Sequence, residues 1–399
     1  MVTSGKKILH ILGSHEIDSV TTSAKILNKY LLTKNYDSKL CYFTNEESNF
    51  NINSFDRTFF FRKFKSFFFS RIINFLKKDK SFAFFSNAGF GNLKKIISRF
   101  NPDILHFHWM PRAIDLKELI NLNIKIIWTI RDFWPFTGGC NYPVFCNKYM
   151  DYCYNCQHLK FNIIKDLSYY NFKNKKNIYK KLKNIYLTFP CLDFIDVYKK
   201  SILNNIKNYQ VIPNSFDETN FCLKDKLKND NIKICFGAQN LDQEWKGTDI
   251  IINIIKHYKK NCEFYIFGKT VKYSNFFKQN KKVRFFGYLN PKELNQIFNE
   301  STILVFPSLY ESFGKIILES LSCGTPVVAK NSFGAKDIIN HMKNGFLVNS
   351  NNYQDYILGI DKLLSIHDQN LINECINSSK NYSIEIVGKQ FENLYKKII

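Results

Sequence analysis

The chain has 399 residues, 45% of them hydrophobic, and carries 57 Lys and Arg against 34 Asp and Glu, a formal net charge of +23. This length is enough for two globular domains with separate cores, and the positive charge favours anionic partners such as nucleic acid, acidic lipid headgroups or phosphorylated small molecules. No apolar run is long enough for a membrane-spanning helix, and we expect no signal peptide. The eleven cysteines are therefore expected to be reduced thiols or metal ligands.

Strands and helices are predicted to alternate along the first half of the chain. Residues 6–12 have the pattern of a buried strand, 22–34 that of a helix with one apolar face, and 40–43 that of a second strand. Further strands are expected at 103–109 and 124–130, with a short helix near 114–122 between them. This alternation indicates a parallel sheet with helices on its faces.

Residues 57–78, RTFFFRKFKSFFFSRIINFLKK, interrupt the alternation. As a helix this segment would gather on one face Phe61, Phe64, Phe68, Ile72 and Phe75. A basic, phenylalanine-rich amphipathic helix is typical of proteins that bind the membrane interface, and the alternative is a helix packed on the core with a solvated basic rim. Nucleic acid fits the charge less well, because no nucleic-acid-binding motif accompanies it.

Four cysteines lie close together in the first half. Cys140, Cys146, Cys153 and Cys156 follow the pattern C-x5-C-x6-C-x2-C. The closing C-x2-C has the usual spacing of half a zinc site, while x5 is wide for the other half. This pattern is compatible with a structural zinc site, with unmetallated thiols or with a redox role. A zinc ion held by four cysteines would have no open position and would brace the loop rather than catalyse.

The same alternation of elements begins again after residues 211–217. Strands are expected at 232–237, 263–267, 283–286, 303–306, 326–329 and 346–348. Helices are expected at 247–259, 291–299, 314–322, 335–342 and 353–365. Two doubly wound α/β halves follow from this pattern, and in such sheets ligands bind beyond the carboxyl ends of the strands.

Two acids flank a glycine at the start of one predicted helix. Glu311 precedes the turn Ser312-Phe313-Gly314, and Glu319 follows about 12 Å further along the helix axis. Free backbone N–H groups at this turn form an anion site, which the glycine opens to a phosphate. The spacing is comparable with a nucleotide sugar from its hexose to its ribose. We therefore predict that the carboxylates bind hydroxyls while the amides bind a diphosphate.

These motifs resemble those of the GT-B-fold retaining glycosyltransferases of family 4, which carry a Glu-x7-Glu motif. The similar stretches of the second half are FPSLYESFGKIILESLSCGTPVVA (306–329), VIPNSFD (211–217), FGAQNLDQEWKG (236–247), FFGYLNPKEL (285–294) and GAKDIINHMKNGFLV (334–348). In the first half, PDILHFHW (102–109) and WTIRDFWPFTGGCNY (128–142) look like the signatures of exopolysaccharide members of the colanic-acid type.

The resemblance implies an α/β fold of the GT-B type, with two Rossmann-like doubly wound domains facing a central cleft. Residues 1–205 would bind the acceptor and 206–375 the nucleotide-sugar donor, and a helix in 376–399 would return to the first domain. The acceptor domain would include the basic segment at 57–80 and a cysteine-rich loop at 137–158.

The resemblance also implies roles for single residues. Glu311 would contact the donor sugar, Glu319 the ribose, and Lys246 the diphosphate leaving group. Further donor-binding residues would be Ser312, Phe313, Gly314 and Asn214. The catalytic set would be Glu311, Arg131 and Asp132, and the acceptor-binding set Gly13, His108, Trp109 and Gly138.

The chain departs from the family pattern at several positions. Gly13 stands alone where the family usually has a Gly-Gly loop, and Arg131 stands where a histidine usually contacts the donor sugar. An arginine usual upstream of Lys246 is missing, and Asp337 stands where a glutamate is usual. These departures fit either a divergent active enzyme or one whose catalysis is lost or altered.

The implied function is transfer of a sugar with retention, without a required cofactor, in bacterial surface polysaccharide synthesis. The donor would be a UDP- or GDP-linked sugar and the acceptor a glycan or a polyprenyl-diphosphate-linked glycan. The enzyme would be cytoplasmic and bound peripherally to the anionic inner face of the cytoplasmic membrane, with no nucleic acid as partner. The alternatives are a catalytically silent glycosyltransferase-like scaffold of a polysaccharide assembly complex and, with less support, a nucleic-acid binder.

Overall fold

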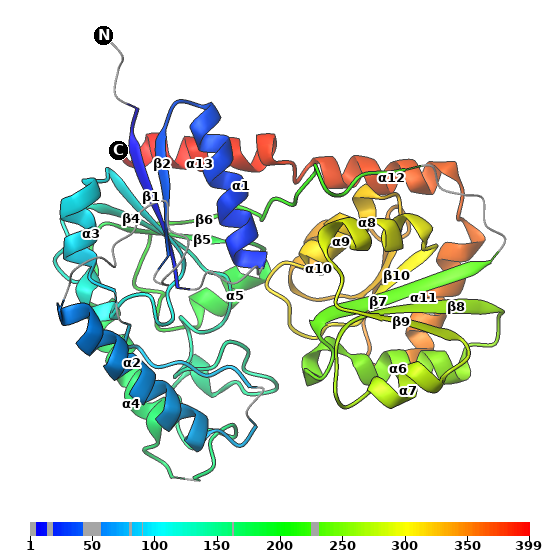
Figure 1. The fold of residues 1–399 in the computed structure, drawn as a ribbon, viewed down its shortest axis with the longest axis horizontal. Coiled ribbons are helices and arrows are strands. Elements are labelled where there is room, and N and C mark those ends of the chain that lie inside the picture. The colour runs from blue at the N-terminus through cyan, green and yellow to red at the C-terminus, as the bar shows by residue number, and fades with distance from the viewer. Residues whose placement is uncertain are drawn as a thin grey trace. The chain divides into compact units, whose positions relative to one another are not determined.

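The computed structural model describes residues 5–13, 19–42, 57–79, 82–89, 91–161, 163–224 and 231–399. The chain divides into two compact units, the first formed by Met1–Pro213 with Val387–Ile399 and the second by Asn214–Ile386 (Figure 1). These divisions fall eight and eleven residues later than the expected limits at 205 and 375. Within the described residues, every helix is too short or too polar to span a bilayer.

The first unit is built on a parallel sheet of six strands in the order β2-β1-β3-β4-β5-β6. Its strands are β1 (Lys7–Leu12), β2 (Asp37–Tyr42), β3 (Ile104–Trp109), β4 (Lys125–Thr129), β5 (Ile185–Phe189) and β6 (Tyr209–Val211). Its helices are α1 (Ser19–Thr33), α2 (Arg57–Leu76), α3 (Leu93–Phe100), α4 (Leu167–Tyr179) and α5 (Asp193–Lys199), with 3-10 turns η1 (Leu116–Leu119) and η2 (Lys148–Met150). The strands and the first helix expected from the sequence are confirmed, and the helix expected near 114–122 is only the short turn η1.

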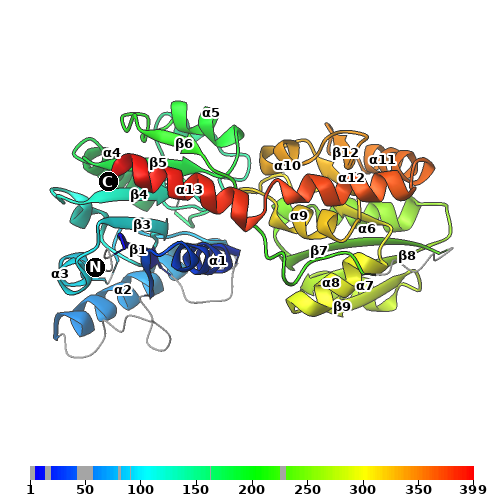
Figure 2. The same cartoon turned by 90° about the horizontal axis from the view of Figure 1, so that it is seen from above.

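The C-terminal helix α13 (Ile384–Ile398) belongs to the first unit from Val387 onward. It packs against the sheet and α1, since Tyr395 contacts His106 on β3 and Gly388 contacts Tyr30 on α1. Figure 2 shows α13 running along this unit. The first core is therefore completed by residues from the far end of the chain.

The second unit has its own six-stranded parallel sheet, in the order β12-β11-β10-β7-β8-β9. Its strands are β7 (Ile232–Asn240), β8 (Cys262–Lys269), β9 (Val283–Gly287), β10 (Ile303–Phe306), β11 (Val327–Lys330) and β12 (Gly345–Val348). Its helical segments are η3 (Glu244–Lys246), α6 (Thr248–His257), α7 (Ser274–Gln279), α8 (Pro291–Glu300), α9 (Lys315–Ser322), α10 (Phe333–Ile338), α11 (Tyr353–Ser365) and α12 (Gln369–Lys380). Counted from β7, this is the Rossmann order 3-2-1-4-5-6, whose direction reverses between β7 and β10.

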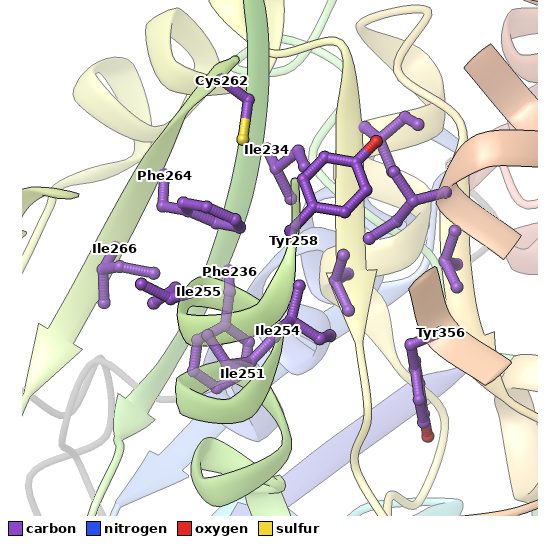
Figure 3. Close-up of a cluster of buried hydrophobic side chains, with 14 of the residues drawn as sticks. Ile234, Phe236, Ile251, Ile254, Ile255, Tyr258, Cys262, Phe264, Ile266 and Tyr356 are labelled. Atoms are coloured by element: carbon purple, nitrogen blue, oxygen red, sulfur yellow. The ribbon is translucent and has the colours of Figure 1, made fainter. Parts of the chain in front are cut away.

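The core of the second unit lies between this sheet and its covering helices. Figure 3 shows Ile251, Ile254 and Ile255 of α6 facing Phe236 of β7 and Phe264 of β8. The spacing of the three isoleucines puts them on one side of the helix. The strands are apolar on consecutive positions because a parallel sheet with helices on its faces is buried on both sides.

Candidate functional site

Lys246 and Glu311 meet where the strand order of the second unit reverses. Lys246 ends η3, which follows β7, and Glu311 lies in the loop that follows β10. Because β7 and β10 are adjacent and parallel, both segments leave the same edge of the sheet. Lys246 Nζ donates to Glu311 Oε2 at 2.6 Å, and the two side chains are 16% and 20% exposed. The sequence-predicted pair is thus a partly buried ion pair at the usual ligand position of this fold.

A glycine lets the two loops approach closely enough for this contact. Gly247 has φ 75°, in the left-handed region, and a Cβ there would lie 2.8 Å from the ring and the carbonyl oxygen of Pro307. The backbone N–H of Leu309 also donates to the carbonyl of Trp245 at 2.8 Å. Any other residue at position 247 would be strained and would push the Lys246 turn away from the Glu311 loop.

The turn that precedes α9 has the geometry expected of an anion site. Gly314 has φ 87° and stands as the N-cap of α9, and no side chain caps the helix. Phe313 is buried, whereas Ser312 is half-buried. The first N–H groups of an α-helix have no partner inside the helix and carry a partial positive charge. In this turn the N–H of Ile317 donates to the carbonyl of Gly314 at 2.9 Å, and no capping side chain offsets the partial positive charge.

Glu319 lies on α9, in an environment that disfavours its charge. Burial raises its pKa, the Asp217 carboxylate raises it further, and the Lys315 ammonium lowers it. Asp217 belongs to the stretch at 211–217, which also contains the buried Asn214. The structure therefore brings this loop to α9. Asp217 and Lys315 were not among the predicted site residues, although Asp217 lies in a motif that the sequence already singled out.

In the first unit, a polar chain crosses the sheet at β1 and β3. The Arg131 guanidinium donates to His108 Nδ1 at 3.1 Å, so that this nitrogen must be the acceptor. The proton of His108 is then on Nε2, which lies 2.8 Å from His10 Nδ1, and His10 Nε2 in turn donates to Ser38 Oγ at 3.1 Å. The Ser38 hydroxyl donates to Asn28 Oδ1 at 2.7 Å. One guanidinium thus fixes the tautomers of two neutral histidines.

Three of the eight histidines also form a tight cluster. One ligating nitrogen from each of His10, His106 and His108 lies within 4.8 Å of the others. His106 is bonded to Tyr395 and Thr129, both at 2.7 Å. Burial lowers the pKa of all three, that of His10 to about 3. Since every ring nitrogen has a protein partner, we interpret the cluster as a buried hydrogen-bond network rather than a metal site. His108 and His106 share a face as predicted, but His108 is fully buried rather than open to an acceptor.

Asp132 lies beside this network and is also buried. Its carboxylate accepts hydrogen bonds from Trp109 Nε1 at 3.0 Å and from the backbone N–H of Trp134 at 2.9 Å. Burial raises the pKa of Asp132 to about 6, although both hydrogen bonds oppose the shift. Gly13 donates its N–H to the carbonyl of Trp109 at 2.9 Å. Gly13, Trp109 and Asp132 are therefore joined near the carboxyl ends of β1 and β3, while residues 14–18, which follow Gly13, lie outside the described residues.

Gly138 has a different environment from the other predicted acceptor residues. Its backbone N–H donates to Cys153 Sγ at 3.2 Å, and together with all four clustered cysteines it lines one small cavity of about 20 Å³. The cysteine sulfurs are more widely spaced than the histidine nitrogens and do not form a group of three within 4.8 Å. The structure therefore brings the four cysteines to one cavity, without the close packing of a metal-bound set.

Comparisons with known proteins agree with this architecture. Residues 221–382 match the model of the family Glycosyl transferases group 1. The uncharacterized glycosyltransferase MJ1607 of Methanocaldococcus jannaschii is 34% identical over 120 residues, 29% of this chain and 30% of that relative. The putative colanic acid biosynthesis glycosyl transferase WcaC of Escherichia coli is 23% identical over 281 residues, 65% of this chain and 68% of that relative. The first match thus spans about a third of that relative's length.

A solved structure of similar fold covers nearly the whole chain. The Alr3699/HepE protein of Anabaena, in complex with UDP and glucose, superposes with a TM-score of 0.62 at 14% identity, over 98% of this chain and 100% of that one. At this identity the likeness shows the fold alone. The chain has the GT-B fold, with two Rossmann-like parallel-sheet units.

Proposed function

We propose that this protein transfers a sugar from a UDP- or GDP-linked donor to a glycan or lipid-linked acceptor, with retention of configuration. The observation that carries the proposal is the Lys246–Glu311 pair at the strand-order reversal, beside the uncapped start of α9. An ammonium and a helix N-terminus attract a diphosphate, and carboxylates accept hydrogen bonds from sugar hydroxyls. The nucleotide sugar is the ligand that needs both groups together.

The ion pair has a specific role in this proposal. When the donor binds, Lys246 exchanges the Glu311 carboxylate for a phosphate oxygen, and Glu311 exchanges the ammonium for a sugar hydroxyl. Lys246 and the first amides of α9 then stabilise the charge that develops on the departing diphosphate, as fixed donors do in other group transfers. Glu319 would bind the ribose hydroxyls. The departing phosphate would accept the proton of the acceptor hydroxyl, so that the reaction needs neither a protein nucleophile nor a divalent metal.

This exchange gives a sharp test of the donor site. Glu311→Gln removes the competitor of the phosphate for Lys246, so the variant should bind UDP or GDP at least as tightly as the wild type while losing hydrolysis and transfer of the sugar nucleotide. Calorimetric titration with each nucleotide and a coupled assay of nucleotide release measure the two effects. Glu374→Gln, at an exposed position of α12, is the matched control. Wild-type turnover in Glu311→Gln would refute the proposed role.

A second candidate is a catalytically silent glycosyltransferase-like scaffold of a polysaccharide assembly complex. It is favoured by Arg131, which stands where the family has a catalytic-site histidine and is bonded to the buried His108. This candidate predicts nucleotide binding without sugar release on any acceptor. If the protein is an active enzyme, sugar release should occur and should depend on Glu311. The assay of nucleotide release described above distinguishes the enzyme from the silent scaffold.

We also propose that the protein binds an anionic membrane surface, on the inner face of the cytoplasmic membrane of a bacterium. Large apolar side chains of α2 stand out in solvent, with Phe64 69% and Phe75 66% exposed. The membrane-facing patch is defined here as Phe64, Phe67, Phe68, Ile72 and Phe75 of α2 with Phe161, Ile163 and Ile164, which follow the cysteine-rich loop at 137–158, all exposed. The two parts adjoin, since the N–H of Lys160 donates to the carbonyl of Leu76 at 2.7 Å.

The charge around this patch also supports a membrane partner. Arg71 lies over the ring of Phe67 and Lys160 over that of Phe75, at 5.0 and 4.8 Å from the ring centroids. Apolar rings inserted below cationic groups match the layering of an anionic bilayer surface. A lipid-linked acceptor would be presented at such a surface. The relative named for colanic acid biosynthesis supports a place in bacterial surface polysaccharide synthesis.

A further inference from the structure

The cysteine loop is a long irregular segment inside the first unit. Between Thr137 and Asp166 its helical structure is limited to the short turn η2 in the described residues. The segment is nonetheless partly internal, and Tyr149 and Cys153 are less than a tenth exposed. Loops of this length without secondary structure are uncommon in compact domains. Backbone hydrogen bonds tie it to the rest of the unit near its two ends, from Phe85 to Gly139 at 2.8 Å and from Lys160 to Leu76 at 2.7 Å, and the stretch between them needs another support.

Backbone donors point at two of the four sulfurs that line its cavity. The N–H of Gly138 donates to Cys153 Sγ at 3.2 Å, and the backbone of His158 forms a hydrogen bond to the thiol of Cys156. Hydrogen bonds of this kind orient metal-bound ligands and stabilise the negative charge of a thiolate. The C-x2-C half of the cluster therefore already has the outer partners that a metal site requires.

A buried ammonium beside the cavity has no carboxylate partner. Lys175 of α4 is fully buried, and it donates to the carbonyls of Trp134 and Thr137, the latter at 2.9 Å. Burial lowers the pKa of Lys175 to about 7, and the groups that oppose this shift are Cys153 and Cys140 first and Asp132 after them. No ion pair within 4.0 Å joins Lys175 to any acid in the part of the chain that the structure describes. A buried cation is costly unless an anion compensates it.

We propose that Cys140, Cys146, Cys153 and Cys156 bind one Zn²⁺ and that Lys175 compensates the charge of the site. Binding replaces four thiol protons, which are released to solvent, and leaves four thiolates around the metal with a net charge of −2. The Lys175 ammonium offsets one of these charges. The sulfurs converge from their present spacing around the cavity of about 20 Å³ to the zinc–sulfur distance of about 2.3 Å.

The other nearby candidate ligand is engaged elsewhere. The His158 ring stacks on Phe82, with 3.7 Å between the ring centroids, and its Nε2 lies 3.1 Å from the amide of Gln157. Four sulfurs therefore complete the set, and no position is left for substrate or water. The zinc would be structural. Through Lys175 and Trp134 it would brace the backbone that donates to Asp132.

The first test is the metal content of the full-length protein purified without chelators. We expect about one zinc per chain, released when an organomercurial titrates the thiols. Replacement of zinc by Co²⁺ should give the intense near-ultraviolet absorption of thiolate-to-cobalt charge transfer. A wild-type protein that retains no zinc, binds no added zinc and shows no such absorption would overturn the proposal.

Variants assign the ligands and the role of Lys175. Cys146→Ser changes the half-exposed ligand and should lower zinc affinity at least tenfold and abolish the cobalt absorption, while Cys222→Ser, at an exposed cysteine outside the loop, should change neither. Lys175→Met should weaken zinc binding at least tenfold, whereas exposed Lys173→Met should leave it unchanged. Unaltered zinc binding in Cys146→Ser would overturn the ligand set, and unaltered affinity in Lys175→Met would overturn its compensating role. Should Cys146→Ser not fold, the wild-type cobalt spectrum still decides.

Discussion

The Lys246 ammonium and the Glu311 carboxylate neutralise each other at the position that the proposed donor would occupy. Their 65-residue separation in sequence is bridged by two adjacent parallel strands and by the close contact of Gly247 with Pro307. An ion pair of this kind keeps both side chains oriented while no nucleotide sugar is bound. It also weakens phosphate binding, because a phosphate must compete with the Glu311 carboxylate for the Lys246 ammonium.

Replacing Lys246 should affect the nucleotide before it affects the sugar. In Lys246→Met, the loss of a charged hydrogen bond to the diphosphate costs about 1.5–3 kcal/mol, so UDP or GDP affinity should fall about 10- to 100-fold, as calorimetric titration would measure. The exposed Lys259→Met serves as control. Equal nucleotide affinity in Lys246→Met and Lys259→Met would show that the diphosphate binds elsewhere.

Asp132 should make a distinctive contribution to the pH dependence of stability. Its pKa in the folded chain is about 6, above the value of about 3.9 expected when unfolded. The unfolded state therefore loses its proton first, and the contribution of Asp132 to the free energy of unfolding falls as the pH rises from about 4 to 6. The expected loss is about 3 kcal/mol.

The measurement is the difference in free energy of unfolding between wild type and Asp132→Asn, followed by urea denaturation from pH 4 to pH 8. The free energy of unfolding of the wild type should fall relative to that of Asp132→Asn as the pH rises to 6. Above pH 7 the difference between the two proteins should stay constant. Asp361→Asn, at a half-exposed carboxylate paired with Lys260, is the control. A difference that does not vary with pH would contradict the raised pKa of Asp132.

Single residues could be predicted where local pattern determines them. The shared face of His106 and His108 follows from the two-residue period of a strand, and the approach of Lys246 to Glu311 follows from motif order. Lys175 could not be found in this way, because a lone lysine in a lysine-rich stretch has no local signal of burial. The chain of fixed tautomers from Arg131 to Asn28 depends on tertiary contacts alone.

At the scale of elements, several helices were predictable because apolar residues recur in them at helical spacing. The predicted segment 57–78 is confirmed as α2, and α6, α9 and α11 lie within a few residues of their expected limits. Helix α4 was missed because its buried face consists of Phe172, Lys175, Ile178 and Tyr179 together with two polar residues. A lysine in a buried position breaks the apolar period on which such predictions depend.

The exposed phenylalanines of α2 should control binding to membranes. Phe64→Asp combined with Phe68→Asp places two charges in the membrane-facing patch, and binding to vesicles with an anionic lipid should fall at least tenfold in co-sedimentation, because each buried ring contributes about 1.5–3 kcal/mol. Val271→Asp, at an apolar residue of the second unit that is 88% exposed, should bind like the wild type. Raised salt should weaken wild-type binding. Undiminished binding by the double variant would show that the membrane-facing patch is not the membrane-binding surface.

At the scale of the whole molecule, two sheets arise from one repeated pattern, and this was predictable from the alternation of elements. The strand order was not, since alternation alone does not state which strands are neighbours. Nor does it explain the return of α13 to the first sheet, which joins Tyr395 to His106 across 289 positions of sequence. The return of α13 depends on tertiary packing. Helix α13 buries an apolar face that includes Val387, Phe391 and Leu394, and this face packs in the first unit.

The return of α13 should therefore contribute measurably to stability through Tyr395. The Tyr395 hydroxyl lies 2.7 Å from His106 Nδ1 in a fully buried setting. Tyr395→Phe leaves that nitrogen without its partner and should lower the free energy of unfolding by about 1–3 kcal/mol. Tyr356 provides a matched control, since it is also fully buried but its hydroxyl has no hydrogen-bond partner among the residues that the structure describes. Tyr356→Phe removes the same atom without breaking a bond, so it should be neutral or stabilising. Urea denaturation of the two variants compares them directly, and equal effects would mean that the contact between α13 and β3 is not a source of stability.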